Sequence, residues 1–269
     1  MIRPGGFNML PTVVKNLLII NGLFFLATIT MEQQGLDLTK YLGLHYFESE
    51  YFSPYQYVTY MFMHGGFSHI LFNMFALWMF GASIENYWGA KKFMIYYFVT
   101  GIGAAFLQTG VNWITISNMH DAITAYKAMP TPETFSVLAN NYFSSFPINP
   151  QFIQQWALDP ANKTAITETY SYINDAMQVV VNIPTVGASG AVFGLLLAFG
   201  MLFPNSIIYV YFALPIKAKY FVMIYGAIEL YSGIANQTGD NVAHFAHLGG
   251  MIFGFFMIKY WKKNEFNQY

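Results

Sequence analysis

The stretch PTVGASGAVFG, residues 184–194, opens an apolar run and predicts a helix that enters lipid over 185–203. Gly187 permits backbone conformations that other residues resist, and Gly190 and Gly194 stand four apart, so a second helix can approach this face closely. Ser189 is therefore expected near a helix N-terminus, beside a tight helix contact. Such a serine is either a small packing residue or a nucleophile, and this stretch alone does not decide between the two.

The composition is that of a polytopic membrane protein. Of the 269 residues, 55% are hydrophobic and only 9% are charged, too few to cover a soluble surface of this size. The chain has no cysteine, which excludes disulfides, thiolate nucleophiles and cysteine-ligated metals. The net charge of −1 argues against nucleic acid as a partner. No cofactor is expected.

Six apolar runs have roughly the length needed to cross a bilayer. They cover residues 13–29, 57–80, 93–113, 185–203, 217–234 and 242–261. The first lacks the short apolar core and small-residue cleavage site of a removable signal peptide. With six spans, nine of the twelve Lys and Arg residues fall on one side, so the positive-inside tendency predicts that both termini are cytoplasmic. The predicted fold is an all-α membrane protein built on a bundle of six transmembrane helices.

Residues 114–184, between the third and fourth spans, are too many for an unstructured connection. Thr131-Pro132-Glu133 and Asp159-Pro160 predict helix starts. Nine aromatic residues could form a core: Tyr126, Phe135, Tyr142, Phe143, Phe146, Phe152, Trp156, Tyr170 and Tyr172. We therefore expect a small helical insertion on the extracytoplasmic face. The apolar piece 207–214 is too short to cross and is expected to lie at the membrane surface.

Polar side chains inside membrane spans are costly and are candidates for function. The second span contains HGGFSHILFN at 64–73, in which His69 and Asn73 are four apart and stack on one helix face. They could donate hydrogen bonds toward one point, or they could simply join helices together.

The sixth span opens with HFAHLGG at 244–250. Gly250 and Gly254 repeat the four-residue spacing of small residues seen in the fourth span, so the two faces could pack closely and bring Ser189 to His247. Histidine suits the task of accepting a serine proton near neutral pH, and the pair is a plausible catalytic dyad. The Ser189 amide and the side chains of His69 and Asn73 could stabilise a developing oxyanion.

No carboxylate occupies an obvious third position. Glu229 is the one acid within the later spans, and its place near the outer end of the fifth favours a structural hydrogen bond at the interface.

A rival interpretation groups His64, His69, His244 and His247 as metal ligands. The sequence has no HExxH motif, and no acid accompanies the four histidines, so we predict no metal site.

Three motifs in this order resemble those of the rhomboid intramembrane serine proteases: HGGFSHILFN at 64–73, GASG at 187–190 and AHLGG at 246–250. The resemblance covers about residues 13–261, apart from the insertion. FPNSIIYVYFALPIK at 203–217 is also similar to the rhomboid connection between the fourth and fifth spans.

The resemblance implies that Ser189 is the nucleophile and His247 the general base. It places His69, Asn73 and the Ser189 amide in the oxyanion hole. His244 is an extra histidine one turn earlier, and the AHxxG pattern assigns the base to the other one.

The resemblance also assigns supporting positions. Gly187 corresponds to the first glycine of the GxSG motif, and Gly250 and Gly254 to the small positions through which the sixth span packs on the fourth. Phe193 stands where many rhomboids carry an aromatic stacked on the catalytic imidazole. His64 resembles a histidine at the mouth of the hydrated cavity.

The chain departs from the family pattern before the second span. Rhomboids often carry Trp-Arg there, and this chain has Tyr55-Gln56, which leaves the internal fastening of the outer loop open.

The reaction implied is hydrolysis of a peptide bond in, or just outside, a transmembrane helix of another membrane protein. The expected location is a bacterial cytoplasmic membrane, with the active site opening to the extracytoplasmic side. One alternative is a rhomboid-like pseudoprotease that binds membrane clients without cutting them. A second, a small-solute transporter, predicts inverted repeats and midplane sites, whereas the polar residues here lie near one leaflet.

Overall fold

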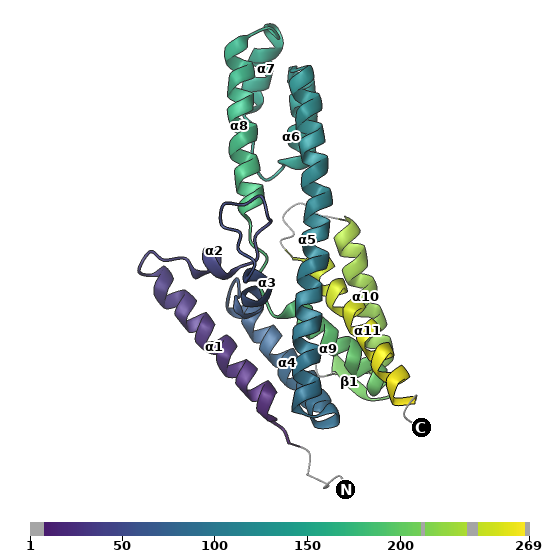
Figure 1. The fold of residues 1–269 in the computed structure, drawn as a ribbon. Helices are drawn as coiled ribbons and strands as arrows, with labels where there is room; N and C mark the ends of the chain where they lie inside the picture. The colour runs from purple at the N-terminus through teal and green to yellow at the C-terminus, as the bar shows by residue number, and fades with distance from the viewer. Residues whose placement is uncertain (1–7, 211–212, 236–241, 267–269) are drawn as a thin grey trace.

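A computed structural model describes residues 8–210, 213–235 and 242–266, and this part of the chain is mostly helical (Figure 1). The helices are α1 (Thr12–Glu32), α2 (Leu38–Leu42), α3 (Gln56–Thr59), η1 (Tyr60–Phe62), α4 (Phe67–Trp88), α5 (Ala90–Ala128), α6 (Pro132–Tyr142), α7 (Pro150–Leu158), α8 (Lys163–Asn182), α9 (Ser189–Leu202), α10 (Ala218–Ala235) and α11 (His244–Phe266). The strands β1 (Ile207–Val210) and β2 (Leu214–Lys217) form an antiparallel hairpin. The short apolar piece at 207–214 thus contributes to a small sheet, which the all-α prediction did not include.

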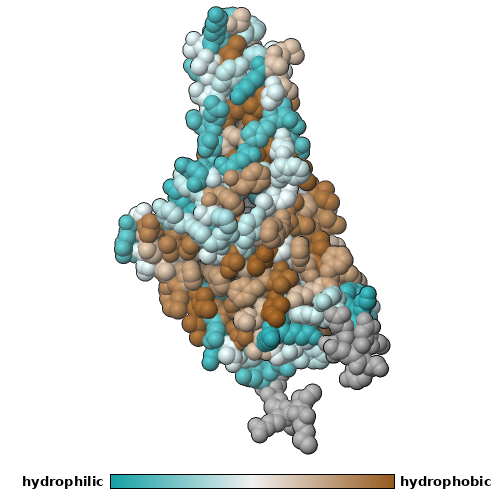
Figure 2. All heavy atoms as spheres, viewed as in Figure 1, coloured by the Kyte–Doolittle hydropathy of each residue, from teal (hydrophilic) through white to brown (hydrophobic). Residues whose placement is uncertain are grey.

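Three of the described helices, α1, α4 and α5, are long and apolar enough to cross a membrane, while α9 is apolar but shorter. On the face shown in Figure 2, the middle of the broad body is largely apolar, while the narrow upper part and the lower end of the body are more polar. Large apolar side chains are exposed on α1, α4, α10 and α11, among them Leu23, Leu26, Phe72, Phe75, Met223, Ile228, Phe255 and Phe256. A soluble monomer rarely exposes such an extensive apolar surface, so lipid covers it and the chain is an integral membrane protein.

Two predicted spans have different limits in the structure. The second was expected over 57–80, but α4 begins only at Phe67 and runs to Trp88. The chain is extended at Gly66, with φ 162° and ψ 173°, because two adjacent glycines disfavour helix there. The third was expected to end at 113, but α5 continues to Ala128 because neither glycine nor proline interrupts residues 111–128.

The fourth span also begins later than expected. Residues 184–188 precede α9, and Thr185 forms an isolated antiparallel bridge with Leu44. The Leu44 amide donates to the Thr185 carbonyl at 2.9 Å, and the Thr185 amide donates back at 2.8 Å. The segment that leads into Ser189 is therefore fastened to the loop that follows α1.

The segment predicted as an insertion, 114–184, forms the upper end of α5 with α6, α7 and α8 alongside it (Figure 1). All nine aromatic residues predicted to pack there belong to one apolar core. Thr131 caps α6 as predicted, with a reciprocal bond to Thr134. The predicted start at Asp159 is wrong: Asp159 ends α7, and Asn162 caps α8 because its side chain accepts the first free amides.

The loop between α1 and α3 is fastened from within by Gln56, whose side chain is fully buried. Its Oε1 accepts from the amides of His45 and Ser53, both at 3.2 Å. Its Nε2 donates to the carbonyls of Tyr41 at 3.0 Å and Tyr51 at 2.8 Å. One glutamine thus satisfies four backbone groups of the loop, which answers the question raised by the missing Trp-Arg pair.

His45 lies in the same loop and is also buried. Burial lowers its pKa below the ordinary value, because desolvation disfavours the charged imidazolium. The neutral ring hydrogen-bonds through Nε2 to the Lys40 carbonyl at 2.9 Å. The loop is therefore a packed, hydrogen-bonded unit, and it contacts the segment before α9 through the bridge between Leu44 and Thr185.

The start of α1 is held by a carboxylate from α4. Glu85 is buried, and its two oxygens accept from the amides of Val13 at 2.9 Å and Val14 at 2.8 Å. Pro11 at the N-cap offers no side-chain acceptor, so Glu85 satisfies helix amides that would otherwise lack partners. Its negative charge also lies at the favourable end of the helix dipole.

We predict that Gln56→Ala destabilises the protein by about 2–4 kcal/mol, because four buried backbone groups lose their partner. Thermal unfolding of the detergent-purified protein, followed by circular dichroism, measures the change. Gln34→Ala is the control, because Gln34 is exposed and should leave the unfolding temperature unchanged. Equal unfolding temperatures for the two variants would contradict the fastening role of Gln56.

Candidate active site

Ser189 is the first residue of α9 and follows a sharp backbone feature at Gly187. Gly187 has φ +122°, which side chains disfavour, and its amide donates to the Tyr60 carbonyl at 2.9 Å. A Cβ atom there would also lie only 2.8 Å from Cε1 and Nε2 of His69. Both the backbone angle and the adjacent ring therefore require glycine at 187.

The close contact between α9 and α11 occurs at Gly190 and Gly250. A Cβ on Gly250 would collide with the Gly190 carbonyl, so the two backbones touch. The predicted role of Gly254 differs in the structure: a Cβ there would strike the Tyr96 hydroxyl of α5, and one on Gly194 would strike Thr100 of α5. The second small residue of each pair thus packs on α5, which lies against both helices.

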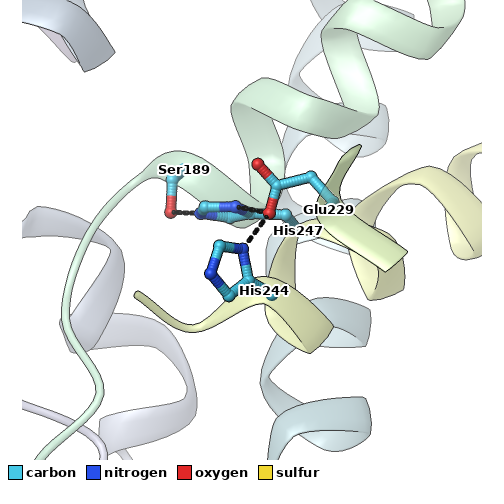
Figure 3. A network of polar contacts seen from close by, with 4 residues as sticks. All are labelled: Ser189, Glu229, His244 and His247. Atoms are coloured by element: carbon cyan, nitrogen blue, oxygen red, sulfur yellow. Dashed lines mark hydrogen bonds and ion pairs between the residues drawn. The ribbon is translucent and has the colours of Figure 1, made fainter. Parts of the chain in front are cut away.

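This contact brings Ser189 and His247 together, as predicted (Figure 3). The Nε2 atom of His247 lies 2.8 Å from Oγ of Ser189. Phe193 stacks on the His247 ring, with centroids 4.2 Å apart and planes inclined by 7°. His247 is 8% exposed, and Phe193 covers one face of its imidazole.

The structure adds a residue that the sequence reasoning assigned elsewhere. Oε2 of Glu229, on α10, lies 2.8 Å from Nδ1 of His247 and 2.6 Å from Nδ1 of His244 (Figure 3). The expectation that no carboxylate occupies a third position is therefore wrong. A signal was present: Glu229 lies six residues before the end of α10 and His247 three after the start of α11, so consecutive antiparallel helices place both at the same end.

The His69 ring lies next to Gly187, close to Ser189, while the Asn73 amide bonds within its own helix. The Gly65 amide donates to Nδ1 of His69 at 3.3 Å, which assigns the proton to Nε2, the atom that faces Gly187. Nδ2 of Asn73 donates to the His69 carbonyl at 2.9 Å and keeps a second N–H. His64 is buried, and its ring packs edge-on against His69 with centroids 5.2 Å apart.

The structure brings together a different set of potential metal ligands from the one that the sequence suggested. Among the described residues, one group of potential ligands, Glu229, His244 and His247, has donor atoms within 4.8 Å of one another. His64 and His69 do not belong to it. An acid does accompany two of the four histidines, contrary to the sequence reading, because α10 supplies it from outside the motif. That the chain has no metal site stays a prediction.

A family model described as the Rhomboid domain matches residues 51–115 and 153–263, more than half of the chain. The chain belongs to the rhomboid family. Rhomboids are in general intramembrane serine proteases. A comparison with curated proteins gives no match. The stretch of this rhomboid between the two matched segments, 116–152, covers the end of α5, all of α6 and the start of α7, within the segment predicted as an insertion.

We predict that Gly250→Ala separates α11 from α9 and slows reaction of Ser189 with a fluorophosphonate probe by about 10²-fold. The added methyl collides with the Gly190 carbonyl, and a displacement of about 1 Å between reacting groups costs that much. The labelling rate of the purified protein measures the effect.

Gly110→Ala is the matched control, because no atom lies within 4 Å of a Cβ at this position. Alanine is also the better helix former, so the control should be at least as stable as the parent. If Gly250→Ala labels as fast as Gly110→Ala, backbone contact does not align the pair.

Proposed function

We propose that this rhomboid is an intramembrane serine endopeptidase that hydrolyses peptide bonds in or near transmembrane helices of other membrane proteins. The observation that carries the proposal is the 2.8 Å contact between Oγ of Ser189 and Nε2 of His247, within helices whose outer faces are apolar. A serine hydroxyl is a weak nucleophile until a base accepts its proton, and this contact supplies the base.

The reaction proceeds through an acyl-enzyme. Ser189 Oγ bonds to the substrate carbonyl carbon as its proton passes to Nε2 of His247, and the carbonyl electrons move onto oxygen. The intermediate collapses, the C–N bond breaks, and His247 gives the proton to the leaving amine. Water then adds to the ester as His247 takes one of its protons. Breaking the C–Oγ bond releases the carboxylic acid and returns the proton to Ser189.

The oxyanion hole is assigned to the Ser189 amide, Nε2 of His69 and the second N–H of Asn73. The Ser189 amide is at the first position of α9, where backbone N–H groups have no partner within the helix. The His69 ring, next to Gly187, has its donor on the side of the nucleophile. Loss of one such donor typically lowers the rate about 10²–10³-fold.

Six spans, α1, α4, α5, α9, α10 and α11, with both termini in the cytoplasm, account best for the charge distribution. Lysines cluster at the helix ends near the two chain termini: Lys15, Lys91, Lys92, Lys217, Lys219, Lys259, Lys262 and Lys263. Arg3, the other cation assigned to this side, lies outside the described residues. By the positive-inside tendency this end is cytoplasmic, and Ser189, at the opposite end of α9, opens to the extracytoplasmic side.

The substrate class follows from where the site lies. A peptide bond within a membrane helix is shielded by its own hydrogen bonds, and its unwound backbone needs partners that lipid does not offer. Substrates are therefore membrane proteins whose helix unwinds near the outer surface, through Gly, Pro or polar residues.

We expect Ser189→Ala and His247→Ala to abolish fluorophosphonate labelling and cleavage of a transmembrane substrate in proteoliposomes. His244→Ala should keep most of both activities, because the Ser189 hydroxyl bonds to His247 while Nδ1 of His244 bonds to Glu229. Ser144→Ala and His120→Ala, both at exposed positions of the insertion, are the controls. Absence of labelling in the unaltered, folded protein would favour the pseudoprotease alternative. If His244→Ala lost labelling while His247→Ala kept it, the general base would be His244.

The insertion is proposed to select substrates, since α8 leads within seven residues into Ser189. We expect that replacing residues 122–175 with a short Gly/Ser linker keeps fluorophosphonate labelling but changes the relative cleavage of different transmembrane substrates. The cut retains Ile116 and Val181, which pack together with Tyr46 at the base of the insertion. Unchanged relative cleavage over a substrate panel would refute this role.

A further inference from the structure

Two imidazole rings contact a single carboxylate oxygen, on the side of His247 opposite Ser189 (Figure 3). Oε2 of Glu229 lies 2.8 Å from Nδ1 of His247, and it lies 2.6 Å from Nδ1 of His244. The three residues come from α10 and the first turn of α11, and Glu229 is only 7% exposed. We propose that Glu229 completes a Ser–His–Glu triad as a positioning residue for His247; this inference rests on the proposed protease function.

The geometry selects one tautomer of His247. A carboxylate has only acceptors, so the contact to Glu229 requires the proton on Nδ1 of His247. The lone pair of Nε2 is then left facing the Ser189 hydroxyl, which is the arrangement a general base needs. Without the carboxylate the ring could carry its proton on Nε2, and that tautomer cannot accept from serine.

The carboxylate also bears on the charged state that forms during the reaction. When His247 takes the serine proton it becomes an imidazolium, in a site where Phe193 covers one ring face. A negative charge 2.8 Å away stabilises this cation, and the effect is stronger in a site of low dielectric than in water. Glu229 itself neither gains nor loses a proton in the cycle.

His244 holds the carboxylate rather than the serine. It contacts the same oxygen, Oε2, and so limits rotation of the Glu229 side chain. With His244 removed, Glu229 still accepts from His247. The effect of losing His244 is therefore expected to be smaller than the effect of losing Glu229.

A purely structural role would make different demands. A hydrogen bond that only joins α10 to α11 could use either imidazole nitrogen, or His244 alone. The carboxylate instead meets His247 at the nitrogen opposite the one that faces Ser189. The order Ser189, His247, Glu229, with the imidazole in the middle, is expected of a catalytic triad but is not needed for a hydrogen bond that only joins two helices.

The test compares Glu229→Gln, Glu229→Asp and Glu229→Ala with Glu85→Gln. Glu85 is a second buried carboxylate of the bundle, and its partners are backbone amides at the start of α1. Cleavage of a transmembrane substrate in proteoliposomes gives kcat and KM, and the rate of fluorophosphonate labelling reports on Ser189 without substrate binding.

We expect Glu229→Gln to lower kcat and the labelling rate about 10²–10⁴-fold, with KM changed less than about threefold, as for a triad acid replaced by its amide. Glu229→Asp should recover at least a tenth of the activity, and added formate should raise the rate of Glu229→Ala. His244→Ala should keep most of the activity. Glu85→Gln should lower the unfolding temperature while its folded fraction labels at the parent rate.

A Glu229→Gln protein that is folded and labels at the parent rate, while Ser189→Ala does not label, would overturn the triad and leave the protease intact. Lack of labelling in the unaltered protein would instead refute the protease itself. If Glu229→Gln does not fold, the Asp and formate comparisons decide, and failure of both to restore rate would overturn the triad.

Discussion

The backbone contact between Gly190 of α9 and Gly250 of α11 is the constraint on which the site depends. Lipid tails are as apolar as leucine, so helices inside a bilayer gain little from burying apolar surface against each other. They associate where small residues let the backbones approach. A side chain at Gly250 would collide with the Gly190 carbonyl and separate the hydroxyl of Ser189 from the ring of His247. A side chain at Gly190 would instead collide with Ala104 of α5 and displace α9 from that helix. The alignment of the proposed catalytic pair therefore depends on glycine at both positions.

Buried polar groups elsewhere in the bundle mostly satisfy backbone atoms. The Tyr60 hydroxyl donates to the Gly101 carbonyl at 2.6 Å, and the Tyr96 hydroxyl donates to the Gly194 carbonyl at 2.8 Å. Glu85 accepts from the amides at the start of α1. Such bonds fix elements in place, since a polar group left without a partner in an apolar medium is costly. Ser189, His247 and Glu229 differ from these residues, because their side chains bond to one another.

The sequence predicted those features that depend on local pattern. Apolar runs located the helices, and the small-residue spacing around Ser189 and His247 indicated that their helices meet. It failed where a contact depends on elements far apart in the chain. Glu229 and His247 lie on different helices, 18 residues apart, so helical spacing could not show that the carboxylate reaches Nδ1. The sequence also does not show that Gln56 is buried, because its partners, such as the Tyr41 and Tyr51 carbonyls, reach it only when the loop is folded.

The path from the insertion to the nucleophile is short and fastened along its length. The Asn182 side chain, at the end of α8, accepts from the Ser49 hydroxyl at 2.6 Å, and Thr185 pairs with Leu44. Gly187 is then held by the Tyr60 carbonyl two residues before Ser189. These contacts attach the segment between α8 and α9 to the loop between α1 and α3, and to η1, before it reaches Ser189. If substrates contact the insertion, it acts by holding them beside the site. The alignment of Ser189 with His247 is still set by the contact between Gly190 and Gly250.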